Sequence, residues 1–501
     1  MFLIISDVKC FKRLNEGEQM DDCNTNEFSW ADCNTIKTRE DSRPYHFIKA
    51  PILSSEEDPN LNECEASQGE QIDFAFCSGE NNLAPWGNSG GFSRRTLHDR
   101  IEPWLTSLFQ SEHFSLLIGS GLSMAMGAIA KVKGQTMEVS AFESFHDEIE
   151  KRAGALSKNR GKPNCEDRFR IASELIAGLR ILDDSRSSKL EEELSKRKLE
   201  LVKGILEGER NLALADESLR SRAWNTLVAF LMSFASRTGP RDRLGIFTTN
   251  YDRLVEEAAD LAGLHLLDRF TGALSPVFRA SRLNIDLHYN PPGIRGEPRY
   301  LEGVARYTKL HGSLDWVQCG QSIRRIGLPF GAESIEPYLK APGLPKDDAA
   351  FGSLIYPTAA KDRETAEYPF VDLFRDFAAA VCQPNGTVVT YGYGFGDDHI
   401  NRVLEDMLTI PSTHLVIISF DHADGRIQRF WSINEGRSDQ ITLLVGNDLG
   451  ELETLTRDFL PKSAIDFVSS RMSDILLSRY VSASGRRFDN GGDGITKGTL
   501  S

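Results

Sequence analysis

The sequence lacks closely spaced cysteines. It has eight cysteines, and no two of them lie within four positions of each other. A zinc ribbon needs two close cysteine pairs to build its tetrahedral thiolate site, so we expect neither that module nor a bound metal. Scattered cysteines without a secretory signal are typical of reduced thiols in the cytoplasm, and we expect a cytoplasmic protein.

Long apolar runs and an excess of positive charge are also missing. No segment approaches the ~20 apolar residues that are needed to span a bilayer, and the apolar start at residues 1–5 is too short for a signal core. We therefore expect no membrane partner. The formal net charge is −15. Strong binding to a phosphate backbone needs clustered Lys and Arg, so we expect no strong direct nucleic-acid binding.

A glycine turn at residues 119–123 directly follows a short apolar run at residues 114–118. The run is typical of a buried parallel strand. Glycines let the backbone come close to a pyrophosphate, and the next helix offers N–H groups and the positive end of its dipole. The residues that we expect to hold a pyrophosphate are Gly119, Ser120, Gly121 and Ser123. Met124 replaces the third glycine of the dinucleotide fingerprint, so an ordinary strand-to-helix turn is the alternative.

A second apolar run, residues 244–247, leads into Thr-Thr-Asn-Tyr-Asp at residues 248–252. The carboxyl end of such a strand brings Thr249, Asn250 and Asp252 to the sheet edge where ligands of open α/β sheets bind. Asp252 can also cap the following helix. No cap requires the amide of Asn250, so we expect it to be exposed to ligand and to contribute little to folding.

His311 lies in Lys-Leu-His-Gly-Ser at residues 309–313, after a short segment that we expect to end at a strand edge. A lone histidine is usually structural. Near a ribose, however, a neutral imidazole can accept the proton of a hydroxyl or a water, which is the work of a general base.

In this order the motifs resemble those of the sirtuin-like family, specifically its bacterial NAD-cleaving branch in antiphage defence. Residues 119–123 correspond to the family's Gly-Ala-Gly-x-Ser, residues 249–252 to its Asn-x-Asp and residues 309–313 to its Leu-His-Gly. Residues 387–401 are similar to its late strand and Gly-Tyr-Ser-Phe-x-Asp-x-His-Ile-Asn turn. The resemblance covers roughly residues 96–430. It implies that the adenosine is flanked by Gly392, Tyr393 and Phe395.

Four departures from the family pattern affect the expected site and activity. Ser120 replaces the usual alanine, and residues 126–129 offer neither the acid nor the arginine of the deacylase Pro-Asp-Phe-Arg stretch. Roughly sixty residues separate Asn250 from His311, which indicates an inserted loop near residues 275–299. The zinc module beside which acyl-peptides enter the deacylases is also missing, so water is the expected acceptor.

The resemblance therefore implies an NAD hydrolase that releases nicotinamide and ADP-ribose as an antiphage effector. Asp252 would bind the carboxamide, Asn250 would orient the ribose and the water, and His311 would act as base. The alternatives are an NAD or ADP-ribose sensor or assembly subunit without turnover, and an NAD-dependent protein deacylase. The family also implies a homo-oligomer. We expect the activating partner to be a separate polypeptide, with a HerA-type ATPase and DNA translocase as the leading candidate by analogy.

Alternating helix and strand patterns predict an α/β fold, a doubly wound Rossmann-like parallel sheet with an inserted helical subdomain. Late strands are expected at residues 387–391, 414–420 and 441–445, with a helix at residues 370–380. We expect an acidic irregular N-terminal extension at residues 1–95, an NAD-binding domain at 96–450 with a helical insertion at about 140–240, and C-terminal helices with a loose tail at 451–501.

Overall fold

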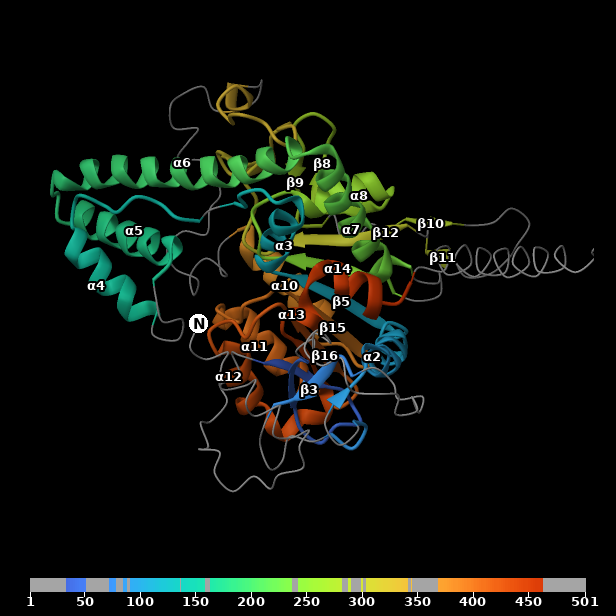
Figure 1. The fold of residues 1–501 in the computed structure, drawn as a ribbon. Coiled ribbons are helices and arrows are strands. Elements are labelled where there is room, and N and C mark those ends of the chain that lie inside the picture. Colours follow the sequence, from blue (N-terminus) through green and yellow to red (C-terminus); the bar gives the residue numbers. More distant parts are fainter. Residues whose placement is uncertain are drawn as a thin grey trace, which may run out of the picture. The chain divides into compact units, whose positions relative to one another are not determined.

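The central element is an eleven-stranded sheet in the order β4-β3-β2-β1-β17-β16-β15-β5-β6-β12-β7 (Figure 1). The computed structural model describes residues 33–50, 72–77, 84–87, 91–135, 137–157, 163–236, 242–281, 287–289, 299–300, 303–340, 344 and 368–462. The chain divides into two units, residues 1–460 and 461–501, and the described helices and strands belong to the first.

The strands of the sheet are β1 (Asn34–Lys37), β2 (Tyr45–Lys49), β3 (Phe74–Phe76), β4 (Gly91–Phe92), β5 (His113–Ile118), β6 (Gly245–Thr248), β7 (His265–Leu267), β12 (Val304–Lys309), β15 (Gly386–Tyr391), β16 (His414–Ser419) and β17 (Ile441–Val445). A four-stranded sheet has the order β13-β14-β9-β8 and comprises β8 (Phe270–Thr271), β9 (Val277–Phe278), β13 (Trp316–Cys319) and β14 (Ser322–Arg325). A third sheet pairs β10 (His288–Tyr289) with β11 (Arg299–Tyr300).

The helices are α2 (Arg94–Leu108), α3 (Gly121–Ala130), α4 (His146–Leu156), α5 (Cys165–Ile181), α6 (Arg186–Ala213), α7 (Glu217–Ala235), α8 (Leu254–Ala262), α10 (Phe370–Val381), α11 (Asp398–Met407), α12 (Arg426–Ile433), α13 (Asn447–Gly450) and α14 (Leu452–Thr454). Short helical turns are η4 (Tyr338–Lys340), η6 (Glu435–Gln440) and η7 (Leu455–Phe459). None of the described helices combines the length and the apolar character that crossing a membrane requires.

The expected doubly wound Rossmann-like sheet is confirmed. From β17 to β7 the sheet is parallel, and β5 lies between β6 and β15. After β5 the chain passes over one face through α3 and α7 to reach β6, whereas after β12 it passes over the other face through α10 to reach β15. The winding direction therefore reverses between β5 and β15, and a crevice at the carboxyl ends of strands is expected at such a switch point.

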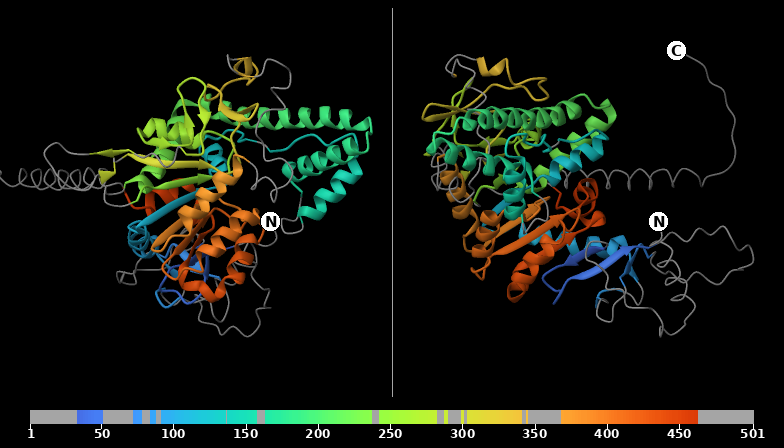
Figure 2. Two further views of the ribbon diagram at one scale, coloured as in Figure 1. Left: turned by 180° about the vertical axis from the view of Figure 1, so that it is seen from behind. Right: turned by 90° about the vertical axis from the view of Figure 1, so that its left-hand side faces the viewer.

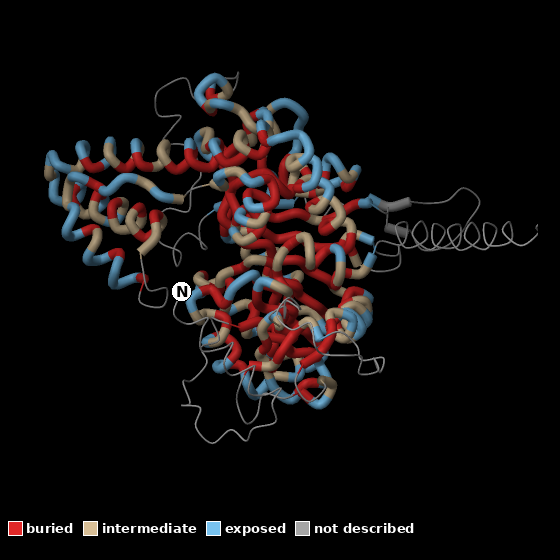
Figure 3. The backbone as a smooth tube through the Cα atoms, in the orientation of Figure 1, coloured by how far each residue is buried: buried red, intermediate tan, exposed pale blue. Residues whose placement is uncertain are grey.

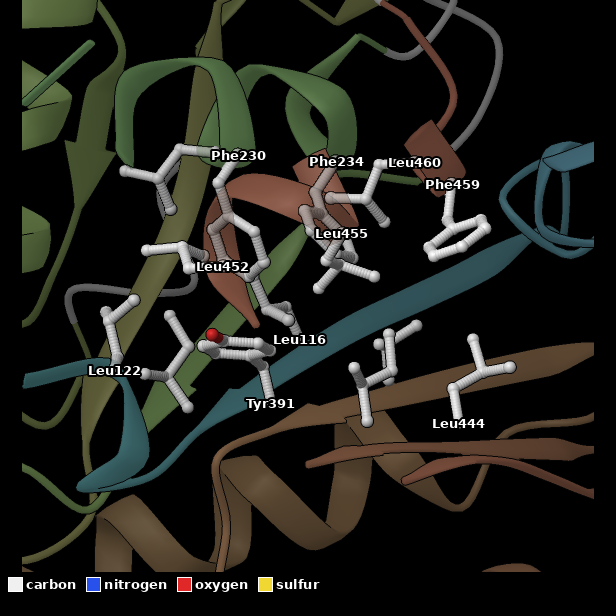
Figure 4. Packing of buried hydrophobic residues seen from close by; sticks show 14 of the residues in the cluster. Leu116, Leu122, Phe230, Phe234, Tyr391, Leu444, Leu452, Leu455, Phe459 and Leu460 are labelled. Carbon is white, nitrogen blue, oxygen red and sulfur yellow. The ribbon is translucent and has the colours of Figure 1, made fainter. Parts of the chain in front are cut away.

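Both faces of the sheet are buried, which explains why its strands have apolar rather than alternating sequences. Along β5, Leu116 and Ile118 pack on the face covered by α7, and Leu117 packs on the opposite face. The ring of Phe230 in α7 lies 4.9 Å from the ring of Tyr391, centroid to centroid (Figure 4). Strands β6, β15, β16 and β17 are buried at every residue, and the centre of the molecule is correspondingly red in Figure 3.

The N-terminal segment that the sequence predicts to be irregular contributes four strands. Strand β1 pairs antiparallel with β17, and β2, β3 and β4 follow as antiparallel neighbours. Aromatic side chains of these strands pack together, with the rings of Phe47 and Phe92 at 5.1 Å. Strands of two to five residues leave little periodicity in a sequence, and their pairing depends on β17, which is distant in the chain.

Helices α4, α5 and the first half of α6 extend away from the central sheet within the stretch expected to be helical (Figures 1 and 2). Their apolar side chains form a separate buried cluster. Leu190, Leu194, Leu201 and Ile205, which share one face of α6, are all buried in it. The loose tail and most of the C-terminal helical stretch lie outside the described residues, as do parts of the insertion near residues 275–299.

Candidate functional site

Four adjacent parallel strands end in register at one edge of the sheet. Ile118 of β5 is aligned with Thr248 of β6 and with Tyr391 of β15, and Thr248 is aligned with Lys309 of β12. Three of the sequence motifs begin within two residues of one of these positions, and the turn of the fourth begins at Gly392, directly after Tyr391. The register therefore brings motifs that are up to about 270 residues apart in the chain to one edge, at the expected crevice.

Three glycines let the backbones of two motifs touch at the switch point. A Cβ on Gly119 would lie 2.4 Å from the carbonyl oxygen of Gly392, and a Cβ on Gly121 would lie 2.6 Å from the Cα of Gly392. Gly392 itself has a φ of 60°, in the left-handed region that favours glycine. The amide of Gly121 donates to the carbonyl of Gly392 at 3.0 Å. No side chain fits at these positions without moving the backbone, which explains the glycines independently of any ligand.

The first turn of α3 follows this contact. Ser120 is the N-cap residue and is exposed, whereas Ser123 is buried. Met124, which replaces the third glycine of the fingerprint, is 70% exposed, so its side chain does not obstruct packing of the helix on the sheet. The turn thus forms without the third glycine, and the exposed hydroxyl of Ser120 lies beside the positive end of the helix dipole.

Asn250, Ser123 and Asp252 form one buried hydrogen-bond chain. The amide nitrogen Nδ2 of Asn250 donates to the carbonyl of Gly119 at 3.0 Å and to Oγ of Ser123 at 3.1 Å. The hydroxyl of Ser123 donates to Oδ2 of Asp252 at 2.6 Å. This arrangement corrects the expectation that the amide of Asn250 is exposed, because the residue is 6% exposed. Both amide protons are used, so Oδ1 is the atom left to accept a hydrogen bond.

The residues that alternate with Asn250 and Asp252 anchor the helical subdomain. The hydroxyl of Tyr251 donates to Oε1 of Glu166 in α5 at 2.8 Å. The backbone amide of Arg253 donates to Oε1 of Glu209 in α6 at 2.9 Å, and its guanidinium pairs with the same carboxylate. The side chains of Arg253 and Glu209 are 8% and 1% exposed. Sequence reasoning missed Glu209, because an acidic residue on a heavily charged helix gives no signal of burial.

Lys309 joins the His311 motif to the Asn250 motif. Its Nζ donates to the backbone carbonyls of Tyr251 and Asp252 and pairs with Oε1 of Glu256 at 3.0 Å. The side chain is 3% exposed. Lys309 is the first residue of the Lys-Leu-His-Gly-Ser motif. Only the strand register shows that its side chain reaches backbone carbonyls in the loop after β6.

His311 has an aspartate partner that sequence reasoning did not assign. Its Nε2 lies 2.9 Å from Oδ2 of Asp397, and both side chains are nearly buried, at 11% and 5% exposure. Asp397 is also the N-cap residue of α11, where Oδ1 accepts from the amide of His399 at 3.0 Å. An aspartate directly before a helix was visible in the sequence, but its contact with a residue 86 positions away was not.

The aromatic residues of the Gly392 loop face the protein interior. Tyr393 and Phe395 are 5% and 4% exposed, and the ring of Phe395 packs against the rings of both Tyr393 and Phe430. The hydroxyl of Tyr393 donates to the backbone carbonyl of Asp397 and to Oδ1 of Asn401. Burial raises the pKa of Tyr393 well above its ordinary value, so the phenol stays neutral. These rings fix the shape of the loop from the interior of the protein.

The structure therefore brings all the residues expected at the site to the same sheet edge, but the contacts form two groups. The first joins the glycine turn, Asn250 and Asp252, and the second joins His311 to the loop after β15. Thr249 is half-buried, and its backbone amide donates to the carbonyl of Ile118 at 3.1 Å. Among the residues that the structure describes, no group of three or more His, Cys, Asp or Glu side chains is arranged to hold a metal ion.

This sheet and edge define an α/β domain of the Rossmann type, and comparison with known proteins narrows the class. Residues 244–435 match the family model of the SIR2-like domain, a stretch that contains Asn250, His311 and the loop after β15. The match supports a sirtuin-like family and an NAD-related activity for this chain. A search of curated proteins found no match.

Solved structures give a more distant likeness. The chain is similar to a structure described as "The Structural basis of Sirtuin Substrate Affinity", with 15% sequence identity and a TM-score of 0.32. The alignment covers 71% of this chain and 97% of that chain.

Proposed function

We propose that the protein hydrolyses NAD to nicotinamide and ADP-ribose. The observation that carries the proposal is the placement of Asn250 and His311, which the SIR2-like match includes, directly after the paired strands β6 and β12. An amide oxygen and an imidazole at one strand edge are the groups needed to position and deprotonate a water beside a ribose. The absence of close cysteine pairs from the sequence favours water over an acyl-peptide as acceptor.

In the proposed reaction the bond between ribose C1′ and the nicotinamide nitrogen breaks, and its electron pair passes to that nitrogen. This transfer neutralises the pyridinium charge and leaves an oxocarbenium-like ribose. The oxygen of a water bonds to C1′ while His311 takes a proton from that water and later releases it to solvent. Asn250 Oδ1 accepts a hydrogen bond from the water or from a ribose hydroxyl, which holds it in position.

The other site residues bind the substrate in this proposal. The backbone of Gly119 and Gly121 and the hydroxyl of Ser120 lie beside the pyrophosphate, where the dipole of α3 favours negative charge. Asp252 receives the amide of the nicotinamide, because a carboxylate retains acceptor sites beyond those used by Ser123 and by the backbone of Leu254. The backbone at Gly392 flanks the adenosine.

The test is to incubate the purified chain with NAD and quantify the products by chromatography. We expect equal amounts of nicotinamide and ADP-ribose, independent of any added acyl-lysine peptide. Tight NAD binding without nicotinamide release would show a sensor instead. Release that depends on the peptide and produces an acylated ADP-ribose would show a deacylase.

We further propose that the hydrolase is a homo-oligomeric antiphage effector that acts with a separate HerA-type ATPase. This part is supported by the resemblance of the motifs to the defence branch of the family. Nicotinamide release should be measured with and without a purified HerA-type ATPase, and light scattering should give the oligomer mass. Full activity of a monomer, unchanged by the ATPase, would refute this assembly.

A further inference from the structure

We propose that Asp397 is a positioning residue that fixes the tautomer of His311 and makes Nδ1 the basic atom of the site. The effect that we expect on turnover rests on the proposed hydrolase function. The structural part of the proposal, the assignment of the ring proton, stands without it.

The geometry leaves one assignment for the proton. Asp397 Oδ2 lies 2.9 Å from Nε2 of His311, and an ionised carboxylate can only accept a hydrogen bond. Nε2 therefore carries the proton of the neutral ring, and the lone pair is on Nδ1. No hydrogen bond to Nδ1 is formed within the described part of the chain, so this nitrogen remains available to a water.

One oxygen of the Asp397 carboxylate is held by a backbone amide, and the backbone of Asp397 is held by a neighbouring side chain. Oδ1 accepts from the amide of His399 at the start of α11, which leaves Oδ2 directed at the imidazole. The backbone carbonyl of Asp397 accepts from the hydroxyl of the buried Tyr393 at 3.1 Å. Phe395, two residues earlier, has a φ of 51°, which turns the chain into the helix. A carboxylate fixed in this way resists rotation away from His311, and this fixation is what orientation of a catalytic group requires.

The chemical consequence is support for the charge that develops during turnover. When Nδ1 takes the proton of the attacking water, the ring becomes an imidazolium, and the adjacent carboxylate stabilises it at short range in a nearly dry environment. The same carboxylate does not need to accept that proton. Removing its charge should therefore lower turnover while leaving NAD binding largely intact.

Asp397→Asn is the variant that isolates this effect. Asparagine caps helices about as well as aspartate, so α11 keeps its cap. With Oδ1 still facing the amide of His399, the Asn side chain presents an N–H₂ donor to Nε2, which requires the opposite tautomer. We expect nitrogen NMR of ¹⁵N-histidine-labelled protein to show Nε2–H in the wild type and Nδ1–H in Asp397→Asn, with His311→Gln assigning the resonances. Turnover should fall about 10²–10⁴-fold, with the Kd for NAD changed by less than about threefold.

The matched control is Asp216→Asn, the same exchange at the N-cap of α7, where the exposed Asp216 accepts from Ser218 and Leu219. This variant should retain the wild-type tautomer and turnover. A wild-type ring protonated on Nδ1, or an Asp397→Asn protein that keeps the wild-type tautomer, would overturn the proposal. Unchanged turnover in Asp397→Asn would also overturn it. A wild type that shows the expected tautomer without hydrolysing NAD would refute the proposed function while leaving the Asp397–His311 assignment intact.

Discussion

Replacing Asn250 with alanine tests whether the Asn-x-Asp motif supports both catalysis and folding. The substitution removes two buried hydrogen bonds, at 3.0 Å to Gly119 and at 3.1 Å to Ser123. Neither acceptor is left without a partner, because the carbonyl of Gly119 still accepts from the amide of Leu122 and the hydroxyl of Ser123 still donates to Asp252. The loss is therefore limited to the net value of two bonds, about 1–3 kcal/mol of unfolding free energy.

The measurements are urea unfolding and NAD turnover on the same preparations. We expect Asn250→Ala to unfold at lower urea with an unchanged slope and to lose hydrolysis by at least about 10²-fold. Thr249→Ala is the control for stability, because the Thr249 hydroxyl makes no hydrogen bond among the described residues. Wild-type stability in Asn250→Ala would refute the buried hydrogen-bond chain. Wild-type turnover would remove Asn250 from the mechanism.

The remaining predictions concern the base, the metal and the pH dependence of stability. His311→Ala should lower turnover about 10²–10⁴-fold, and calorimetric titration should find NAD binding retained. Elemental analysis should find no stoichiometric zinc, and a chelator should leave the melting temperature unchanged; about one zinc per chain would contradict this. Burial lowers the pKa of His414 to about 3. Since the unfolded chain then binds more protons, stability should fall as pH drops from about 6.5, by up to ~1.4 kcal/mol per unit, and less steeply in His414→Gln.

The sequence predicted the parallel strands of the central sheet and the polar or glycine residues at their carboxyl ends, because each of these strands is a short apolar run followed at once by such residues. It could not predict β1–β4, since their pairing depends on β17. The sequence predicts an exposed Asn250, because it gives no sign that the side chain bonds to the Gly119 carbonyl and to Ser123. These partners lie at a strand end about 130 residues earlier. Tyr393 and Phe395 were expected beside the adenosine, but an aromatic residue in a loop gives no indication of which way its ring points.

The residues from Asn250 to Arg253 alternate between two sets of partners, and the sequence pattern indicates only one of these sets. Asn250 and Asp252 are directed to the glycine turn, whereas Tyr251 and Arg253 are directed to Glu166 of α5 and Glu209 of α6. Polar residues at a strand end are typical of a ligand site, and this pattern indicated Asn250 and Asp252. The second pair is used by the helical subdomain, and burial of the Arg253–Glu209 ion pair makes the loss of either partner costly. The loop that presents Asn250 is thus held from the helical side as well as from the sheet, and its geometry depends on Glu209 and Glu166, which lie 44 and 85 residues before their partners.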